Sequence, residues 1–157
     1  MKQTLRRVLW LALITVPVTN TALARAQQGA NLAERYLFAA ANQDRVGHGL
    51  QPVVFDEQLA RAARSHAVEM VRHVGISHQF PAEPGLTARG AAAGAHFSLI
   101  TENVAEAPDA SKINDLWMAS AGHRANLLDP KVDSVGIAVI LDRGEYYAVE
   151  DFARRVE

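Results

Sequence analysis

The chain has 157 residues, with 16 lysines and arginines, 17 aspartates and glutamates, and no cysteine. This length fits one domain built around one hydrophobic core. The absence of cysteine excludes a disulfide framework, thiolate chemistry and a cysteine-ligated zinc site, so burial alone must hold the fold together.

The N-terminus has the composition of a secretory signal peptide. Lys2, Arg6 and Arg7 precede an apolar run over residues 8–18, and an Ala-x-Ala exit follows at residues 22–26. Such a run is shorter than the roughly 20 apolar residues that span a bilayer. We therefore expect residues 1–26 to be a signal peptide and residues 27–157 to form the exported domain, in the periplasm or the medium. A retained anchor or an amphipathic helix is the alternative.

Removal of residues 1–26 changes the charge of the protein. Four basic residues leave with the signal and no acidic one does, so 12 basic and 17 acidic residues remain, a net charge of −5. Proteins that track phosphates need clustered positive charge. We therefore expect no nucleic acid as a partner. We also expect no stable membrane span, and we expect the protein to be a monomer.

Two helices are predicted at the start of the exported domain. After a polar lead-in over residues 27–31, helical spacing begins at Asn31, with apolar positions 32, 36, 37, 40 and 41, and ends near Gly47. A second helix begins at Asp56 as N-cap and is stopped by Gly75. Its apolar stripe comprises Leu59, Ala62, Ala63, His66, Ala67, Met70 and Val71. We expect the two helices to pack together through these faces.

The rest of the chain predicts a small sheet with further helices. Residues 76–95 read as an irregular segment, 97–104 as a strand, 110–120 as a helix capped by Asp109, and 122–128 as a short helical turn. Strands at 135–141 and 146–152 are joined by a hairpin turn in which Gly144 can adopt a positive φ. This order predicts an α+β fold, a mixed or antiparallel sheet flanked by helices.

Three polar residues stand out against this framework: His78 after the second helix, Glu102 in a strand, and His123 in the short helical turn. Two imidazoles and a carboxylate form a partial shell for a divalent metal or an acid/base set. Taken singly, each has an ordinary explanation, such as pairing of Glu102 with Arg124. His66 lies on an apolar stripe and is expected to be a packing residue.

These segments together resemble the CAP superfamily: cysteine-rich secretory proteins, antigen 5 and plant pathogenesis-related proteins, with cysteine-free bacterial relatives. The resemblance runs in order through residues 59–70, Ser77-His78, residues 102–105, residues 117–128, residues 135–139 and residues 146–152. Its most specific part is the Trp-x-x-Ser-x-Gly-His-Arg-x-Asn-Leu-Leu block at 117–128.

The resemblance implies a three-layer α-β-α sandwich with a central cleft lined by His78, Glu102 and His123. Many animal members carry a second cleft glutamate where this chain has Ser120, so the acidic set is reduced here. Thr101 replaces the glycine that often precedes the strand glutamate. We assign Ser120 to the cleft and expect its side chain to cap the short helix.

Two functions from different classes fit this cleft. As a binding module, it would take a ligand, a lipid or an extracellular or cell-envelope protein, or a divalent metal such as zinc held by His78 and His123, with Glu102 as a possible third ligand. As an extracellular metal-assisted hydrolase, His78 or Glu102 would act as general base. No His-Glu-x-x-His or Gly-x-Ser-x-Gly motif is present. We favour binding.

A third interpretation is that the three polar residues are structural and lock helix to sheet with Arg124, Asn126 and Asp151. Asn126 is expected to bond the loop before Pro130, and Trp117 to lie in the core. Exposure separates these interpretations, because ligand-binding groups must be open to solvent whereas structural ones are buried and fully bonded.

Overall fold

The centre of the protein is a four-stranded mixed sheet, seen in a computed structural model that describes residues 20–156, of which 20–27, 29 and 30 are described for the backbone only. The strands are β1 (Val54–Phe55), β2 (Phe97–Ala107), β3 (Ser134–Asp142) and β4 (Glu145–Arg155). Their order is β1-β3-β4-β2, with β1 parallel to β3 and the other pairs antiparallel. In the β3–β4 turn both Arg143 and Gly144 have positive φ, 49° and 90°, as a tight two-residue hairpin requires.

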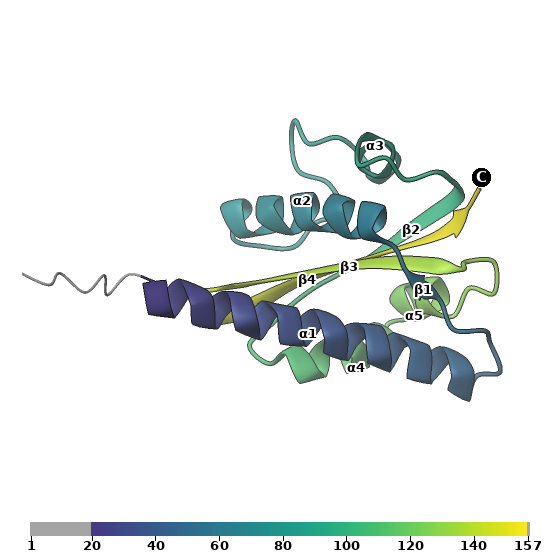
Figure 1. Ribbon diagram of the computed structural model, residues 1–157, viewed down its shortest axis with the longest axis horizontal. Coiled ribbons are helices and arrows are strands. Elements are labelled where there is room, and N and C mark those ends of the chain that lie inside the picture. Colours follow the sequence, from purple (N-terminus) through teal and green to yellow (C-terminus); the bar gives the residue numbers. More distant parts are fainter. Residues whose placement is uncertain (1–19, 157) are drawn as a thin grey trace, which may run out of the picture.

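Helices cover both faces of this sheet (Figure 1). On one face lie α2 (Glu57–His73) and α3 (Leu86–Ala92); on the other lie α1 (Asn20–Gly47), α4 (Ile113–Ala119) and α5 (Ala121–Leu127). A 3₁₀ turn at Ala110–Lys112 leads into α4. The predicted α+β class and its three-layer α-β-α arrangement are therefore confirmed.

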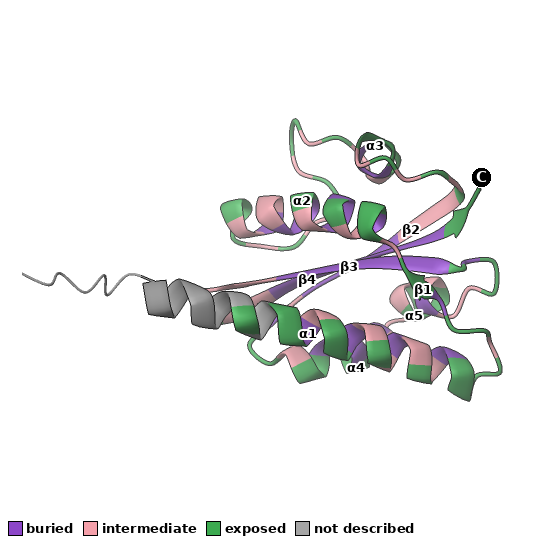
Figure 2. Cartoon of the chain, in the orientation of Figure 1, coloured by how far each residue is buried: buried purple, intermediate pink, exposed green. Residues whose placement is uncertain are grey.

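The hydrophobic core lies in two parts, one on each side of the sheet, and the middle strands are buried along most of their length (Figure 2). On the α1 side, Leu37, Trp117 and Phe152 are fully buried. On the α2 side, Met70 packs with Val149. The indole of Trp117 donates to the backbone oxygen of Val104 over 3.0 Å, so the predicted core role of this tryptophan is confirmed.

Helix α2 follows its sequence signals closely. The Asp56 carboxylate accepts from the backbone N–H groups of Gln58 and Leu59 over 2.8 and 3.0 Å, which confirms the N-cap. The predicted apolar stripe is buried except for Val71, which is half-buried. The helix ends at His73, and Val74, not Gly75, takes the left-handed capping conformation with φ 52°.

Helix α1 differs from its prediction in extent and in its buried face. It already begins at Asn20, so residues 27–31 are helical rather than a lead-in. Ala33, Leu37 and Ala41 are buried, whereas Leu32 and Tyr36 are 54% and 44% exposed. The sheet contacts a row of residues four apart, which leaves their neighbours one position earlier facing solvent. Residues 1–19 of the expected signal peptide lie outside the described residues, and the signal peptide stays a prediction.

The expected apolar contact between α1 and α2 is wrong, because the two helices lie on opposite faces of the sheet. Each apolar face covers one side of a sheet that is hydrophobic on both sides. The helices meet instead at the edge of β3 through a polar link. The Glu34 carboxylate pairs with Arg64 of α2 and also accepts from the backbone N–H of Val139 over 3.0 Å.

Three further predictions are corrected in their details. Residues 76–95 are not wholly irregular, since they contain α3. The strand expected to end at residue 104 continues to Ala107, and the helix expected over 110–120 is divided between the 3₁₀ turn and α4. In α4, Ile113 is buried and Leu116 is 51% exposed.

The contact of α2 with the sheet predicts a large effect for one substitution. A Cβ atom at Gly136 of β3 would lie 2.1 Å from both the carbonyl carbon of Leu59 and the amide nitrogen of Ala60. Because backbone cannot yield as a side chain can, we expect Gly136→Ala to lower the free energy of unfolding by more than about 3 kcal/mol, measured by urea denaturation.

Gly122 supplies the matched control, since a Cβ there meets no atom within 4 Å. Gly122→Ala, inside α5, is expected to raise the stability by up to about 1 kcal/mol. Equal effects of the two substitutions would contradict the close helix–sheet contact.

Candidate functional site

The candidate site lies at the outer strand β2, where residues from both helical layers meet. Successive strand residues point to opposite faces. Glu102 therefore points to the side of α2 and α3, and Asn103 to the side of α5. His78 follows α2 in the chain, and His123 lies in the first turn of α5. The two histidines thus reach β2 from opposite layers.

His78 is oriented by a buried carboxylate. Its Nδ1 lies 2.9 Å from Oε1 of Glu102, and the side chains are 61% and 2% exposed, respectively. The hydrogen bond to Glu102 raises the pKa of His78, against the opposing effect of partial burial. Its Nε2 makes no hydrogen bond to residues 20–156 and is therefore available to a ligand.

His123 lies beside His78, and we call these two residues the histidine pair. Their ring centroids are 6.4 Å apart, with the planes inclined by 53°. Partial burial lowers the pKa of His123, and the positive charge of His78 lowers it further. The ring of His123 makes no hydrogen bond within the described part of the chain, but its backbone oxygen accepts from the Asn103 amide over 3.2 Å.

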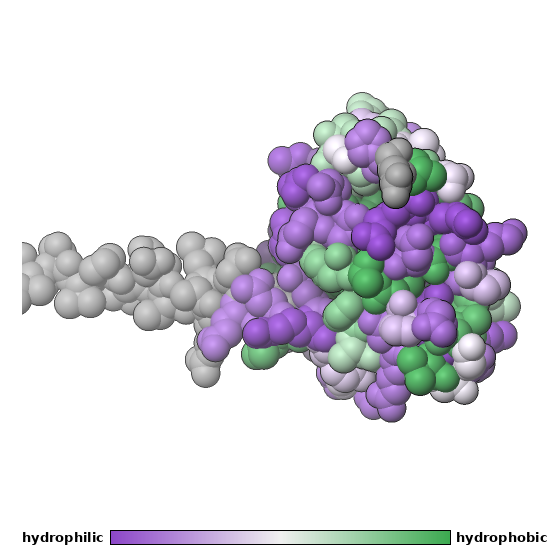
Figure 3. All heavy atoms as spheres, turned by 45° about the vertical axis from the view of Figure 1, so that its right-hand side comes forward, coloured by the Kyte–Doolittle hydropathy of each residue, from purple (hydrophilic) through white to green (hydrophobic). Residues whose placement is uncertain are grey.

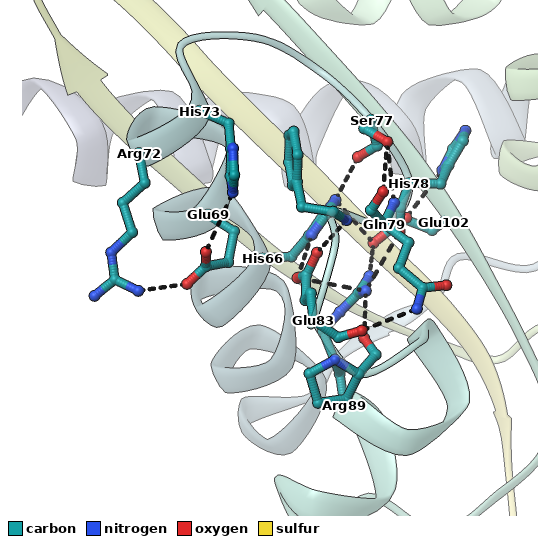
Figure 4. A network of polar contacts seen from close by, with 12 residues as sticks. His66, Glu69, Arg72, His73, Ser77, His78, Gln79, Glu83, Arg89 and Glu102 are labelled. Atoms are coloured by element: carbon teal, nitrogen blue, oxygen red, sulfur yellow. Dashed lines mark hydrogen bonds and ion pairs between the residues drawn. The ribbon is translucent and has the colours of Figure 1, made fainter.

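Behind the histidine pair is a buried charge cluster, formed by His66, Glu83, Arg89 and Glu102 (Figure 4). Arg89 from α3 forms an ion pair with Glu102 and lies 3.5 Å from Glu83. Its guanidinium also donates to the backbone oxygens of His78 and Pro84 over 3.3 and 3.1 Å. Arg89 therefore fixes both the carboxylate and the segment that carries His78.

His66 completes the cluster from α2. It is fully buried, with Nδ1 2.6 Å from Glu83 Oε1 and Nε2 2.7 Å from the backbone oxygen of Ser77. The predicted packing role of His66 is confirmed. Both ring nitrogens therefore face hydrogen-bond acceptors, and the ring is held at both ends. Arg89 is the cation that the two carboxylates of the cluster share.

Two further acids lie next to each other on β4, one on each face of the sheet. Asp151 is the cross-strand partner of Glu102, and Glu150 that of Asn103. Both carboxyl groups are buried, and none of their oxygens has a hydrogen-bond partner among the described residues. Burial raises the pKa of both groups well above the ordinary range, and the charge of Glu102 raises that of Asp151 further.

The predicted site residues fare differently. The structure brings His78, Glu102 and His123 together as the sequence suggested. Ser120 occupies the N-cap position of α5, but its side chain makes no capping bond, so that prediction is wrong. Its assignment to the site stays a prediction.

Of two further expected contacts, one is replaced by another and one is present. Glu102 pairs with Arg89 rather than Arg124, whose guanidinium donates instead to the backbone oxygen of Met118. The Asn126 side-chain amide donates to the backbone oxygen of Glu102 and to Asn103 Oδ1, both over 3.0 Å. Its backbone oxygen accepts from the N–H of Asp129 over 3.3 Å, so the predicted bond to the loop before Pro130 is confirmed.

No sequence pattern predicted Glu83, Arg89 or the partnership of Asp151 with Glu102. Glu83 and Arg89 lie in a segment rich in glycine, alanine and proline, where no periodic pattern marks them. The available signal was indirect: a histidine inside an apolar helix stripe needs polar partners, and these had to come from elsewhere in the chain.

The donor set for a metal is limited to the histidine pair. Within residues 20–156 no group of three His, Asp or Glu side chains is arranged to hold a metal ion. Glu102, considered as a third ligand, has one oxygen on His78 and the other on Arg89. Three hollows of about 440, 270 and 230 Å³ are lined by other residues.

A family model for CAP, the cysteine-rich secretory protein family, matches residues 38–152. The chain belongs to this family. The predicted resemblance to CAP proteins is thereby confirmed.

Three relatives illustrate the likeness. The uncharacterized protein YkwD of Bacillus subtilis is 27% identical over 127 residues, which cover 80% of this chain and 49% of that protein. An extracellular SCP-domain protein of Bacillus anthracis has a TM-score of 0.76 at 26% identity, covering 90% of this chain and 45% of that one. An outer surface protein of Borrelia burgdorferi has a TM-score of 0.73 at 18% identity, covering 79% of this chain and 93% of that one.

These relatives set the limits of what the comparison shows. The CAP chain spans about half the length of the two Bacillus proteins, and the likeness to the Borrelia protein shows the fold alone. The solved relatives are extracellular or surface proteins. In the described part of this chain, no helix combines the length and the hydropathy needed to cross a membrane.

The cluster predicts that its single arginine is essential for stability. Arg89→Met would leave two buried carboxylates facing each other with one cation fewer, so we expect a loss of about 3–5 kcal/mol in the free energy of unfolding by urea denaturation. The control is Arg72→Met, which removes a solvent-exposed pair with Glu69 and should cost less than about 1 kcal/mol. Similar losses for both variants would contradict a cluster-specific role.

Glu150 predicts a pH dependence of stability. Its pKa is raised in the folded state, so the folded protein holds a proton that the unfolded chain releases. This contribution is fully present below the ordinary carboxyl pKa and is lost as the pH rises towards the raised value. Relative to Glu150→Gln, the wild-type protein should therefore lose stability between pH 5 and 8, by up to about 1.4 kcal/mol per pH unit.

The measurement is urea denaturation across this pH range at constant ionic strength. Glu57→Gln, the same acid-to-amide change at an exposed position, is the control. A Glu150→Gln difference that is independent of pH would mean that the buried carboxyl group is ionised in the folded protein.

Proposed function

We propose that this CAP domain is an exported binding module whose histidine pair takes a divalent metal ion, with zinc as the test ion, or a ligand held through such an ion. The observation that carries this proposal is the pairing of a solvent-exposed His78, its Nε2 open, with the neighbouring His123. The buried Glu102 holds the other nitrogen of His78 at 2.9 Å.

The arrangement fits the chemistry of histidine ligands. Metal-binding histidines commonly donate their second ring N–H to a carboxylate, which fixes the tautomer and raises the basicity of the ligating nitrogen. His78 and Glu102 have this relation. A metal held by two imidazoles would keep positions open for water or for oxygen atoms of a ligand, and such a site would be labile and would exchange its ion readily.

Hydrolysis receives less support from the same geometry. A general base must be free to accept a proton from the attacking water. Glu102 is buried and already accepts from His78 and Arg89. Ser120 makes no side-chain hydrogen bond to His123 or to any other described residue, so nothing activates it as a nucleophile. We therefore place binding before catalysis.

Export to the periplasm or the medium is part of the proposal, supported by the signal-like residues 1–26 and by the extracellular or surface relatives. A ligand from the cell envelope, a lipid headgroup or a protein, would suit that compartment. On the face in Figure 3, hydrophobic side chains lie in small patches between hydrophilic ones. The visible part of this face therefore offers no broad apolar surface.

Zinc titration of the purified protein by calorimetry tests the proposal. We expect saturable binding near neutral pH, weakened at least about tenfold by His78→Ala or His123→Ala and abolished in the double variant, because each substitution removes one of two ligands. His96→Ala, at an exposed histidine outside the site, is the control and should bind as the wild type does. Unchanged binding in the double variant, or none in the wild type, would refute the metal site.

A further inference from the structure

The carboxyl group of Asp151 is buried, and it takes part in none of the contacts described so far. In water such a group is ionised at neutral pH. The residue is fully buried in β4, and neither oxygen has a hydrogen-bond partner in the described structure. A buried polar atom without a partner is costly, and an unpaired buried charge more so. The position therefore needs an explanation beyond packing.

Its surroundings leave one direction for a partner. Asp151 is directly opposite Glu102 in the antiparallel β2–β4 pair, and side chains in such pairs lie about 5 Å apart on one face of the sheet. Its neighbour on β3 is Gly136, which has no side chain and lies against the backbone of Leu59 and Ala60. The charged groups that act on Asp151 are Glu102 and, more weakly, Arg89.

The donors around Asp151 decide which form its carboxyl group takes. Arg89 pairs with Glu102 and lies near Glu83, both ring nitrogens of His66 face other acceptors, and no described donor lies within hydrogen-bond distance of Asp151. An ionised Asp151 would add a third buried anion with no donor to satisfy it. A protonated carboxyl group, in contrast, carries its own O–H donor and faces an acceptor in Glu102.

We propose that Asp151 is a positioning residue of the histidine pair, a neutral carboxylic acid that donates a hydrogen bond to Glu102 from beneath. Glu102 is then held by Arg89, Asp151 and His78. Fixed in this way, its Oε1 selects the tautomer of His78 that has the proton on Nδ1, and Nε2 is left as an acceptor towards solvent. The part of this inference that concerns metal affinity rests on the proposed function; the tautomer does not.

Two substitutions at this position separate the hydrogen bond from the volume of the side chain. Asp151→Asn keeps the shape and an N–H donor towards Glu102, whereas Asp151→Ala removes the donor. Glu150→Gln is the matched control, the same acid-to-amide change one residue earlier on the opposite face of the sheet. Three quantities are measured: the carbon-13 shift of the Asp151 carboxyl, the nitrogen-15 shifts of the His78 ring, and the affinity for zinc.

We expect the carboxyl shift of a protonated acid at neutral pH. In Asp151→Asn, His78 should keep the Nδ1–H tautomer and zinc affinity should stay within about threefold of the wild type; in Asp151→Ala, the tautomers should mix and affinity should fall by about tenfold or more. Glu150→Gln should leave both the ring shifts and the affinity unchanged.

An ionised carboxyl shift at neutral pH would overturn the proposal, and so would a wild-type His78 tautomer in Asp151→Ala. If Asp151→Ala does not fold, the carboxyl shift and the Asp151→Asn ring shifts decide. If the wild-type protein binds no zinc, the metal site fails while the carboxyl and ring shifts still test the position of Asp151.

Discussion

Two carboxylates, Glu83 and Glu102, are buried together under α2 and α3, and the guanidinium of Arg89 lies between them. Burial of an ion without a counter-ion costs several kcal/mol, so this arrangement depends on a cation whose planar fork can contact several acceptors at once. Arg89 contacts both carboxylates and the backbone oxygens of His78 and Pro84. The contacts of Arg89 therefore account for the ordered path of residues 76–92, for the burial of Glu102 and for the position of His78.

The sheet determines where the charge cluster around Arg89 can form. Gly136 allows α2 to approach β3 backbone to backbone, and this places α2 over β3 and β4, with Nε2 of His66 3.8 Å from Oε2 of Glu102. Neighbouring residues on β2 point to opposite faces of the sheet. Glu102 therefore contacts the layer of α2 and α3, while Asn103 bonds the backbone of His123 and the Asn126 amide in the layer of α5. The outer strand β2 thus positions His78 and His123 side by side, although they come from opposite helical layers.

How much of this could be predicted depended on the range of the interactions. The N-cap at Asp56, the stripe of α2 and the turn at Gly144 are local, and the sequence predicts them from neighbouring residues alone. The meeting of His78, Glu102 and His123 is long-range, and the ordered resemblance to CAP proteins predicted it where spacing did not. Neither a local pattern nor the resemblance predicted the role of Arg89, because an arginine among glycines and alanines is expected to be exposed to solvent. The choice of Arg89 over Arg124 as partner of Glu102 requires the path of the chain through α3, and no local pattern encodes that path.

The pKa directions of the histidine pair show how the site divides its charge. The hydrogen bond with Glu102 raises the pKa of His78, whereas burial and the charge of His78 lower the pKa of His123. The two rings therefore titrate as a coupled pair in which the first proton is held on His78 and resists a second on His123. A metal ion must displace that first proton, and an acidic ligand would instead be attracted by it. If the histidine pair binds a metal ion as proposed, it does so in its neutral form, with Glu102 holding His78 in place.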